Sequence, residues 1–151
     1  MSNVLVVEDE PMNWQVFQRI LTRKGGFTAM HTEEVETVLQ AARSGEADLI
    51  LMDVSLNNSR YQGKPIDGIA ITRLLKANAE TARVPVILVT ANGTLADRHH
   101  FLAISGADDF IPKPIVDYEA FLSQIRANLP PSQPPQTAQG IRWGLTPALS
   151  Y

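Results

Sequence analysis

Short stretches of uniformly apolar residues recur along most of the chain. The clearest are residues 3–7, 49–52 and 84–89, the last interrupted by Pro85, and residues 27–31 and 109–111 are weaker candidates. Runs of this length without polar alternation are typical of strands buried on both faces, as in a parallel sheet covered by helices on each side. The pattern therefore predicts five strands in one parallel sheet.

Between these strands, apolar residues recur at helical spacing. The expected helices are a stripe from Asn13 to Leu21 with Pro11 at the first helical position, residues 35–42 ending before Gly45, residues 70–75, residues 95–105 stopped by Gly106, and residues 118–129. Five alternating β–α units predict an α/β fold. We expect a doubly wound, flavodoxin-like sheet of five parallel strands in the common order 2-1-3-4-5, with helices on both faces.

Proline marks a change of organisation near the end of the chain. Five of the 10 prolines fall in the last 22 residues, where Pro130-Pro131 and Pro134-Pro135 favour extended backbone over helix. We therefore predict a domain at residues 1–129 and a proline-rich tail at residues 130–151. Ile141, Trp143 and Leu145 alternate within this tail, so it is either an unstructured end or a segment that docks through Trp143 on the domain or on another chain.

Composition narrows the class of protein. The 151 residues include no cysteine, which excludes disulfides and thiolate chemistry, and the net charge of −3 does not favour nucleic acid as a partner. No apolar run approaches 18 residues and the first residues form a strand rather than a secretory signal. We expect a cytoplasmic protein that interacts with neither nucleic acid nor membrane.

Polar side chains that can bind a metal or take part in a reaction lie where four of the five predicted strands end. The first strand leads into Glu8-Asp9-Glu10, the third ends at Asp53, the fourth at Thr90 and the fifth at Lys113. Since ligands of open α/β sheets bind at the carboxyl ends of the strands, these groups should meet. Clustered carboxylates suit Mg²⁺, and a carboxylate, a hydroxyl and a lysine beside it suit phosphoryl transfer.

Five short motifs occur in a recognisable order. They are Glu8-Asp9, Leu51-Met52-Asp53, Asp67-Gly68, Val89-Thr90-Ala91 and Ile111-Pro112-Lys113-Pro114. In this order they resemble the receiver domain of two-component response regulators, and the resemblance covers about residues 3–128.

The resemblance implies a role for each site residue. Asp53 would accept a phosphoryl group from a sensor histidine kinase or a phosphotransfer protein. Glu8, Asp9, Asp53 and the carbonyl of Ser55 would hold Mg²⁺, and Thr90 and Lys113 would contact the phosphoryl oxygens. Thr90 and Phe110 would form the conformational switch, and the Lys113–Pro114 peptide would be cis.

The implied function is signalling through phosphorylation-dependent protein–protein contacts in a phosphorelay, with no classical enzyme activity beyond self-phosphorylation and self-dephosphorylation. A downstream protein target, or a second copy in a homodimer, would bind the face that includes Phe110, Ala120 and the last helix. The alternative is a receiver-fold docking module that works without phosphorylation. A hydrolase of the haloacid-dehalogenase class is disfavoured, since that class needs an aspartate where Ser55 stands.

One segment departs from the family. Receivers usually run about eight residues from the acceptor aspartate to the glycine of the Asp-Gly pair, with a proline four residues after the acceptor. Here Gly68 comes 15 positions after Asp53, and Asn57 stands in place of that proline. We expect the inserted loop, residues 57–64, to be mobile and to control access to Asp53. Arg60 and Lys64 would either attract a phosphoryl group or acidic partner, or only solvate the loop.

Three histidines and Trp14 lie outside these motifs. Adjacent His99 and His100 point in different directions on a helix, so solvation is expected rather than a shared ligand. His31 is expected to be structural. Trp14 lies off the apolar stripe, and its spacing leaves open whether it stands at the mouth of the site or caps the core.

Overall fold

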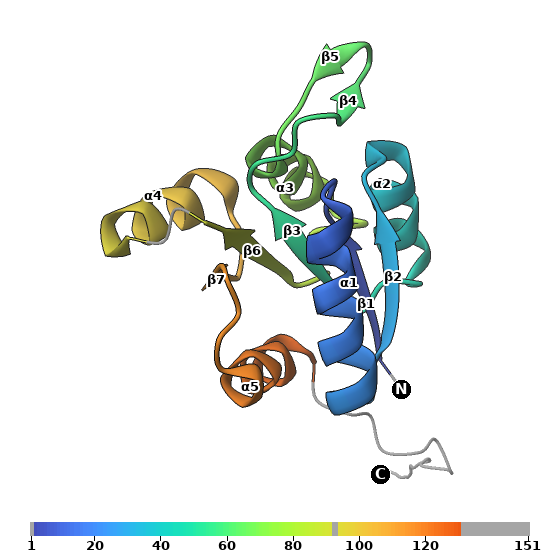
Figure 1. Ribbon diagram of the computed structural model, residues 1–151. Helices are drawn as coiled ribbons and strands as arrows, with labels where there is room; N and C mark the ends of the chain where they lie inside the picture. Colours follow the sequence, from blue (N-terminus) through green and yellow to red (C-terminus); the bar gives the residue numbers. More distant parts are fainter. Residues whose placement is uncertain (1, 92–93, 131–151) are drawn as a thin grey trace, which may run out of the picture.

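A single parallel sheet organises the molecule. The computed structural model describes residues 2–91 and 94–130. The sheet has five strands: β1 (Asn3–Val7), β2 (Thr28–Thr32), β3 (Leu49–Asp53), β6 (Val86–Thr90) and β7 (Asp109–Pro112). They are all parallel and lie in the order β2-β1-β3-β6-β7 (Figure 1). Counted along the chain, this is the predicted order 2-1-3-4-5, so the predicted fold class is confirmed.

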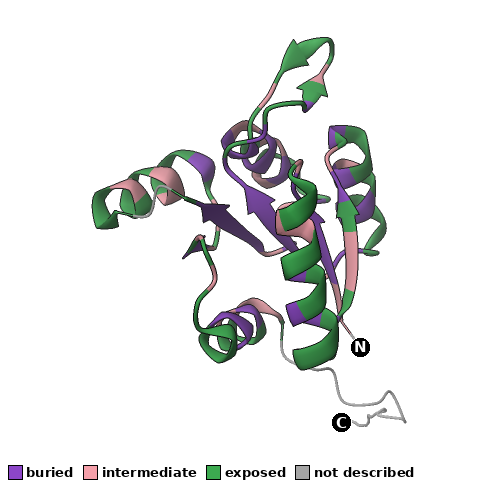
Figure 2. Cartoon of the chain, viewed as in Figure 1, coloured by how far each residue is buried: buried purple, intermediate pink, exposed green. Residues whose placement is uncertain are grey.

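Helices cover both faces of the sheet. On one face lie α1 (Pro11–Arg19), its continuation η1 (Ile20–Lys24), and α5 (Tyr118–Asn128), and on the other lie α2 (Val35–Ser44), α3 (Gly68–Ala77) and α4 (Leu95–Ser105). Every residue of β3 and β6 is buried, and these strands form the dark centre of Figure 2. The two apolar faces of each central strand therefore feed two separate core clusters, which explains the uniformly apolar runs in the sequence.

The helix ends follow local side-chain chemistry. Asp67, Thr94 and Asp117 each accept a hydrogen bond from a backbone N–H in the first turn of α3, α4 and α5. Gly45 and Gly106 end α2 and α4 with φ of 84° and 78°, a conformation in which glycine has no steric penalty. The three acceptor side chains thus begin helices at the carboxyl edge of the sheet, and the two glycines end helices near its amino edge.

The inserted segment contains regular structure that the sequence did not predict. Residues Arg60–Tyr61 (β4) and Lys64–Pro65 (β5) pair as a short antiparallel hairpin that projects beyond α2 and α3 (Figure 1). Gln62 and Gly63 form its turn with φ of 54° and 81°, the signs of a type I′ turn. At its base, the Ser59 hydroxyl donates to the Glu33 carbonyl at 2.7 Å. The mobility and gating expected of this segment stay predictions.

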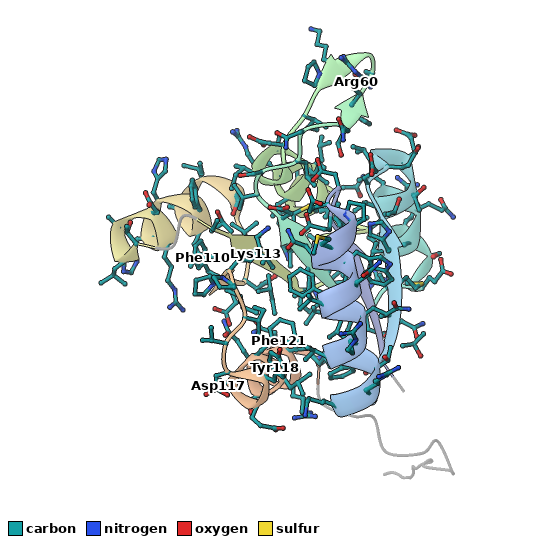
Figure 3. All side chains as sticks on the ribbon, in the orientation of Figure 1. Arg60, Phe110, Lys113, Asp117, Tyr118 and Phe121 are labelled. Carbon is teal, nitrogen blue, oxygen red and sulfur yellow. The ribbon has the colours of Figure 1, made fainter. Side chains whose placement is uncertain are left out.

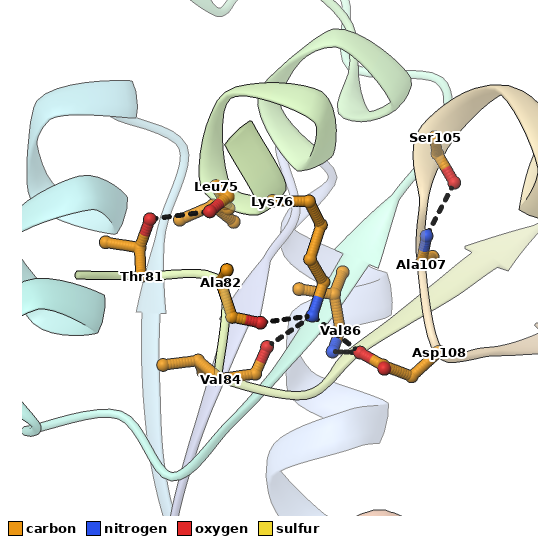
Figure 4. Close-up of polar contacts among 9 residues, drawn as sticks. All are labelled: Leu75, Lys76, Thr81, Ala82, Val84, Val86, Ser105, Ala107 and Asp108. Atoms are coloured by element: carbon orange, nitrogen blue, oxygen red, sulfur yellow. Dashed lines mark hydrogen bonds and ion pairs between the residues drawn. The ribbon is translucent and has the colours of Figure 1, made fainter. Parts of the chain in front are cut away.

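A polar network joins the elements at the amino ends of the strands. The Lys76 ammonium donates to the carbonyls of Ala82 and Val84 at 3.0 and 2.9 Å and to the Asp108 carboxylate at 2.8 Å (Figure 4). The same Asp108 oxygen accepts the N–H of Val86, the first residue of β6, at 2.8 Å. One lysine at the end of α3 thus connects the loops that precede β6 and β7.

The domain boundary and the tail stay predictions. α5 ends at Asn128, and Leu129 packs against the cluster formed by α1, η1 and α5. Residues 131–151, including Ile141, Trp143 and Leu145, lie outside the described residues. Within residues 2–91 and 94–130, no helix combines the length and apolar character needed to cross a membrane.

Candidate functional site

Four strand ends bring the predicted residues together. Glu8 and Asp9 directly follow β1, Asp53 is the last residue of β3, Thr90 is the last residue of β6, and Lys113 directly follows β7. The register places Asp53 opposite Val89 and Thr90 opposite Pro112, so the four ends are level. The site lies at the carboxyl edge, where strand order reverses between β1 and β3, as the topology rule for open α/β sheets requires.

Three carboxylates form the centre of this site. One oxygen each from Glu8, Asp9 and Asp53 lies within 4.8 Å of the others. Only 1% of Glu8 and 4% of Asp53 is exposed, whereas Asp9 is half-buried. Bringing three acids this close, two of them out of water, is unfavourable unless a cation or a proton compensates.

Lys113 supplies one compensating charge. Its ammonium lies 3.3 Å from Asp53 Oδ2 and 3.6 Å from Glu8 Oε1. Its backbone N–H donates to the Thr90 carbonyl at 2.8 Å, and the Lys113–Pro114 peptide is cis, as the resemblance implies. Figure 3 labels Lys113 beside Phe110, on the segment formed by β7 and the residues that follow it. The end of β7 therefore places this side chain beside the Asp53 carboxylate.

A proton supplies further compensation. Burial raises the pKa of Glu8 from 4.5 to about 7, and the hydrogen bond and negative charge of Asp53 add to this effect. The Lys113 ammonium and the Glu10 N–H, which donates to Glu8 Oε2 at 3.3 Å, oppose it. Without a metal, Glu8 is therefore largely protonated in mildly acidic solution.

The donor set fits a hard divalent cation. Carboxylate oxygens are the ligands that Mg²⁺ takes, and three of them converge here. Among the described residues, Glu8 Oε1 is a buried side-chain oxygen without a hydrogen-bond partner, so it retains lone pairs for a cation or its water. Ser55 is exposed and its N–H donates to Asp53 Oδ1 at 3.0 Å. The role of its carbonyl stays a prediction.

Two backbone groups of the site were not identified from the sequence. The Asn57 N–H, at the base of the hairpin, donates to Asp9 Oδ2 at 2.6 Å across 48 residues of sequence. A Cβ at Gly68 would overlap the Asp53 carbonyl oxygen, so only glycine lets α3 begin this close to Asp53. The Asp67-Gly68 motif is visible in the sequence, but its close contact with Asp53 was not predicted, and no side-chain pattern could signal the Asn57 contact.

A stacked pair supports Glu8 from behind. His31 Nε2 lies 2.6 Å from the Glu8 carbonyl, which can only accept, so this nitrogen carries the proton. The Trp14 ring stacks on His31 with centroids 4.8 Å apart and packs partly against the α1–α5 core cluster. The structural role expected of His31 is confirmed. Trp14 combines both positions that its spacing left open, since it lies near the site and covers the end of the core.

The expected switch residues lie on β6 and β7. Thr90 is buried at 1% exposure, and Phe110 at 2% stacks on Phe101 of α4 with centroids 6.4 Å apart. The Gln124 amide of α5 donates to the Phe110 carbonyl at 2.8 Å. Phe110 thus joins α4, β7 and α5 in one packed unit. His99 and His100 are exposed on α4, as expected.

Comparison with known proteins agrees with this geometry. The sequence pattern that defines the response regulator receiver domain family matches residues 4–126. The chain is 32% identical over 128 residues to the polar-differentiation response regulators DivK of Brucella ovis and Brucella anthropi, a match that covers 85% of this chain and 96% of each relative.

Solved structures extend the comparison to three dimensions. One similar structure is the receiver domain of a sensor histidine kinase from Pseudomonas aeruginosa, which has a magnesium ion in its active-site cleft. It is 31% identical to this chain with a TM-score of 0.65, and the match covers 82% of this chain and 93% of that one. The Vibrio cholerae chemotaxis protein CheY4, 19% identical, matches in fold with a TM-score of 0.69 over 85% of this chain and 99% of its own.

Proposed function

Because this chain belongs to the response regulator receiver family, we propose that it is a phosphoacceptor in a two-component phosphorelay. A sensor histidine kinase or a phosphotransfer protein donates the phosphoryl group, and Asp53 receives it. The phosphorylated form then signals through contacts with a downstream protein. The chain acts as a signalling protein rather than as a classical enzyme, and its chemistry is limited to gaining and losing this group.

One observation carries the proposal. Asp53 stands at the end of a fully buried strand, with the Lys113 ammonium 3.3 Å from one carboxylate oxygen and two further carboxylates within 4.8 Å. A structural ion pair would need one acid for one base. Three converging acids and one lysine instead suit a site that gathers cations around an incoming phosphoryl group, since that chemistry depends on positioning and charge neutralisation.

The transfer follows from this arrangement. A carboxylate oxygen of Asp53 attacks the phosphorus of a phosphohistidine, the new P–O bond forms as the P–N bond breaks, and the imidazole that leaves takes up a proton. Lys113 stays beside Asp53 Oδ2 and neutralises charge on the phosphoryl oxygens. The Thr90 hydroxyl, on the adjacent strand end, donates to another of these oxygens. The Ser55 N–H orients the acceptor through Asp53 Oδ1.

Mg²⁺ is the cofactor that the donor set favours. Asp9, Asp53, Glu8 and the Ser55 carbonyl would hold it. When bound, it neutralises the phosphoryl charge that the single lysine cannot balance. The chain's own part is to keep Asp9 in place through the Asn57 N–H and to keep the buried Glu8 carboxylate close to the cluster.

The output surface follows from the packing of Phe110. This ring contacts α4, and its carbonyl is held by Gln124 of α5, so a shift of Thr90 and Phe110 on phosphorylation would change the face formed by α4, β7 and α5. We propose that this face, including Ala120, binds the downstream target or a second copy of the chain.

Labelling with a small phosphodonor tests the proposal. The full chain incubated with acetyl phosphate and Mg²⁺ should gain the mass of one phosphoryl group, and chelation of the metal should prevent the gain. Asp53→Asn should not be labelled, whereas the matched control Asp97→Asn, on α4, should be labelled as the wild type is. A wild type that takes up no phosphate would favour the alternative, a docking module that works without phosphorylation.

A further inference from the structure

The turn that carries Glu8 and Asp9 begins where the pairing of β1 with β2 ends. The last paired residues are Val7 and Thr32. The Glu8 N–H still donates to the Thr32 carbonyl at 3.3 Å, so the next bond of a regular parallel ladder would run from the Glu34 N–H to the Glu8 carbonyl. The Glu34 N–H instead donates to the Thr32 hydroxyl at 3.0 Å. The Glu8 carbonyl must therefore take its donor from outside the ladder.

His31 supplies this donor from its side chain. Its Nε2 lies 2.6 Å from the Glu8 carbonyl oxygen, so the imidazole continues the pairing of β1 with β2 by one bond. The backbone of β2 ends at Thr32, and the chain then leads into α2. Only 1% of Glu8 is exposed, so water is a poor substitute for this donor.

The Trp14 ring limits the movement of this imidazole. His31 is exposed on β2, the edge strand of the sheet (Figure 1), and an exposed side chain has several rotamers available. Trp14 stacks on it with the ring planes 15° apart. The Trp14 N–H donates to the Glu10 carbonyl at 3.1 Å, and its ring packs against the core cluster of α1 and α5. The imidazole is thus held by a residue that is itself bonded to the acidic turn.

The position of this turn decides where two of the three clustered carboxylates lie. Glu8 and Asp9 are adjacent in the turn, whereas Asp53 belongs to β3, so a shift of the turn would separate the first two from the third. Groups that hold metal ligands from outside affect metal affinity strongly, because they fix the direction of the ligand atoms. A bond to the Glu8 backbone is a contact of this kind.

A purely structural role is the simpler alternative. In that case the pair would only fasten β2 to α1, and its loss would lower the stability of the fold without a separate effect on the metal site. Two contacts favour the positioning role. His31 binds the backbone at the start of the acidic turn, and Trp14 binds the backbone at Glu10, its end.

We propose that His31, held by Trp14, is a positioning residue for the Mg²⁺ site: its Nε2–H fixes the Glu8 carbonyl and so keeps the Glu8 and Asp9 carboxylates beside Asp53. The inference rests on the Mg²⁺ site of the function proposed above. It assigns His31 no contact with the metal or with the phosphoryl group.

Mg²⁺ titration of the full chain by calorimetry, in one mildly alkaline buffer, tests the proposal. His31→Phe keeps a ring that can stack on Trp14 but has no N–H, so its Mg²⁺ affinity should fall about tenfold. His31→Gln places an amide N–H close to where Nε2 lies, so its affinity should stay within about threefold of the wild type. Trp14→Leu keeps the donor without the stack and should fall between these two. His99→Phe, the same substitution on the exposed face of α4, should leave the affinity unchanged.

Urea unfolding of the same variants in chelator separates positioning from stability. If the pair is only structural, Mg²⁺ affinity will follow the unfolding free energy from variant to variant. If His31 positions the turn, affinity will follow the presence of the N–H donor. Wild-type affinity in His31→Phe would overturn the proposal, as would a loss in His31→Gln as large as that in His31→Phe.

Labelling by acetyl phosphate distinguishes this inference from the proposed function. At saturating Mg²⁺, His31→Phe should be labelled at the wild-type rate, because its defect is in holding the metal. A slow rate in that variant at saturating Mg²⁺ would overturn the assigned role. A wild type that binds Mg²⁺ but takes up no phosphate would refute the phosphoacceptor function and leave the comparison of Mg²⁺ affinities valid.

Discussion

At the scale of single residues, the site around Asp53 needs a residue without a side chain where α3 begins. Gly68 begins α3 against the Asp53 carbonyl, where a side chain has no room. Its N–H donates to the Val54 carbonyl at 3.2 Å, which ties the start of α3 to the strand end that carries Asp53. The glycine of the Asp-Gly pair is thus needed for close approach and not for a left-handed backbone.

Gly68→Ala should therefore damage the site and the fold together. The methyl group must push α3 away from β3, and overpacking of this kind costs about 1–3 kcal/mol of unfolding free energy. Urea unfolding and a Mg²⁺ titration measure the two effects. Gly26→Ala is the comparison, since its methyl group meets open space at φ +71° and should cost about 1 kcal/mol without weakening Mg²⁺ binding. Unchanged Mg²⁺ affinity in Gly68→Ala would contradict the argument.

Glu8 predicts a pH dependence of stability. Its pKa of about 7 in the folded protein lies above the 4.5 of the free side chain, so the native state binds the proton more tightly. The contribution to stability is complete below about pH 4.5 and is lost as the pH rises through 7.

In chelator, the unfolding free energy of the wild type should therefore fall relative to that of Glu8→Gln between pH 5 and pH 8, by up to about 3 kcal/mol. Urea unfolding at several pH values measures this, with Glu36→Gln on α2 as the control. Parallel curves for wild type and Glu8→Gln would mean that Glu8 titrates normally.

At the scale of elements, polar contacts set the spacing between neighbouring segments at both edges of the sheet. At the carboxyl edge, the Asn57 N–H ties the hairpin base to Asp9, and Ser59 ties it to the segment before α2. At the amino edge, Lys76 ties α3 to the loops before β6 and β7. The contacts at the carboxyl edge involve the site and those at the amino edge do not. Substitutions at the amino edge should therefore change stability without changing Mg²⁺ binding.

Lys76→Met keeps the aliphatic stem and removes three donated hydrogen bonds (Figure 4). The unfolding free energy should fall by about 1–2 kcal/mol, since two backbone carbonyls lose a charged donor that is itself only 17% exposed in its side chain. Mg²⁺ affinity should not change, because the network lies at the opposite edge. Chemical denaturation measures the unfolding free energy of Lys76→Met against that of the control Arg73→Met, an exposed position on α3. The control should change this free energy by no more than about 0.5 kcal/mol. Equal stability of the two variants would show that the network contributes little.

At the scale of the whole molecule, the acidic cluster should make stability depend on Mg²⁺. Two of its carboxylates are buried in the native state, and a cation that binds only there stabilises the fold by mass action. At a Mg²⁺ concentration ten times its Kd, the gain is about 1.4 kcal/mol.

Thermal unfolding with Mg²⁺ and with chelator measures this gain. The wild type should unfold at a higher temperature with Mg²⁺, and Asp9→Ala should lose most of the difference because a direct ligand is gone. Asp97→Ala, outside the cluster, should retain it. A wild type whose unfolding temperature ignores Mg²⁺ would argue against the assigned ligands.

Much of this protein follows from its sequence alone. Uniformly apolar runs predicted β1, β3 and β6, because strands buried on both faces tolerate few polar residues, and weaker patterns predicted β2 and β7. The strand order was expected because it is the common one for such folds. Glu8, Asp9, Asp53, Thr90 and Lys113 were expected to meet because parallel strands bring their carboxyl ends to one edge. Acidic, hydroxyl and lysine side chains can be read from the sequence. Once they are assigned to strand ends at one edge of the sheet, few positions remain for them.

Only the tertiary structure decided the remaining contacts. The hairpin in the insertion, the Asn57 N–H on Asp9 and the stacking of Trp14 on His31 join segments whose spacing in the sequence carries no signal. A backbone N–H is present at every residue except proline, so nothing in the composition distinguishes the one that binds. Which donor meets which acceptor depends on where the packing of the whole domain places two distant loops, and that placement is a property of the folded chain.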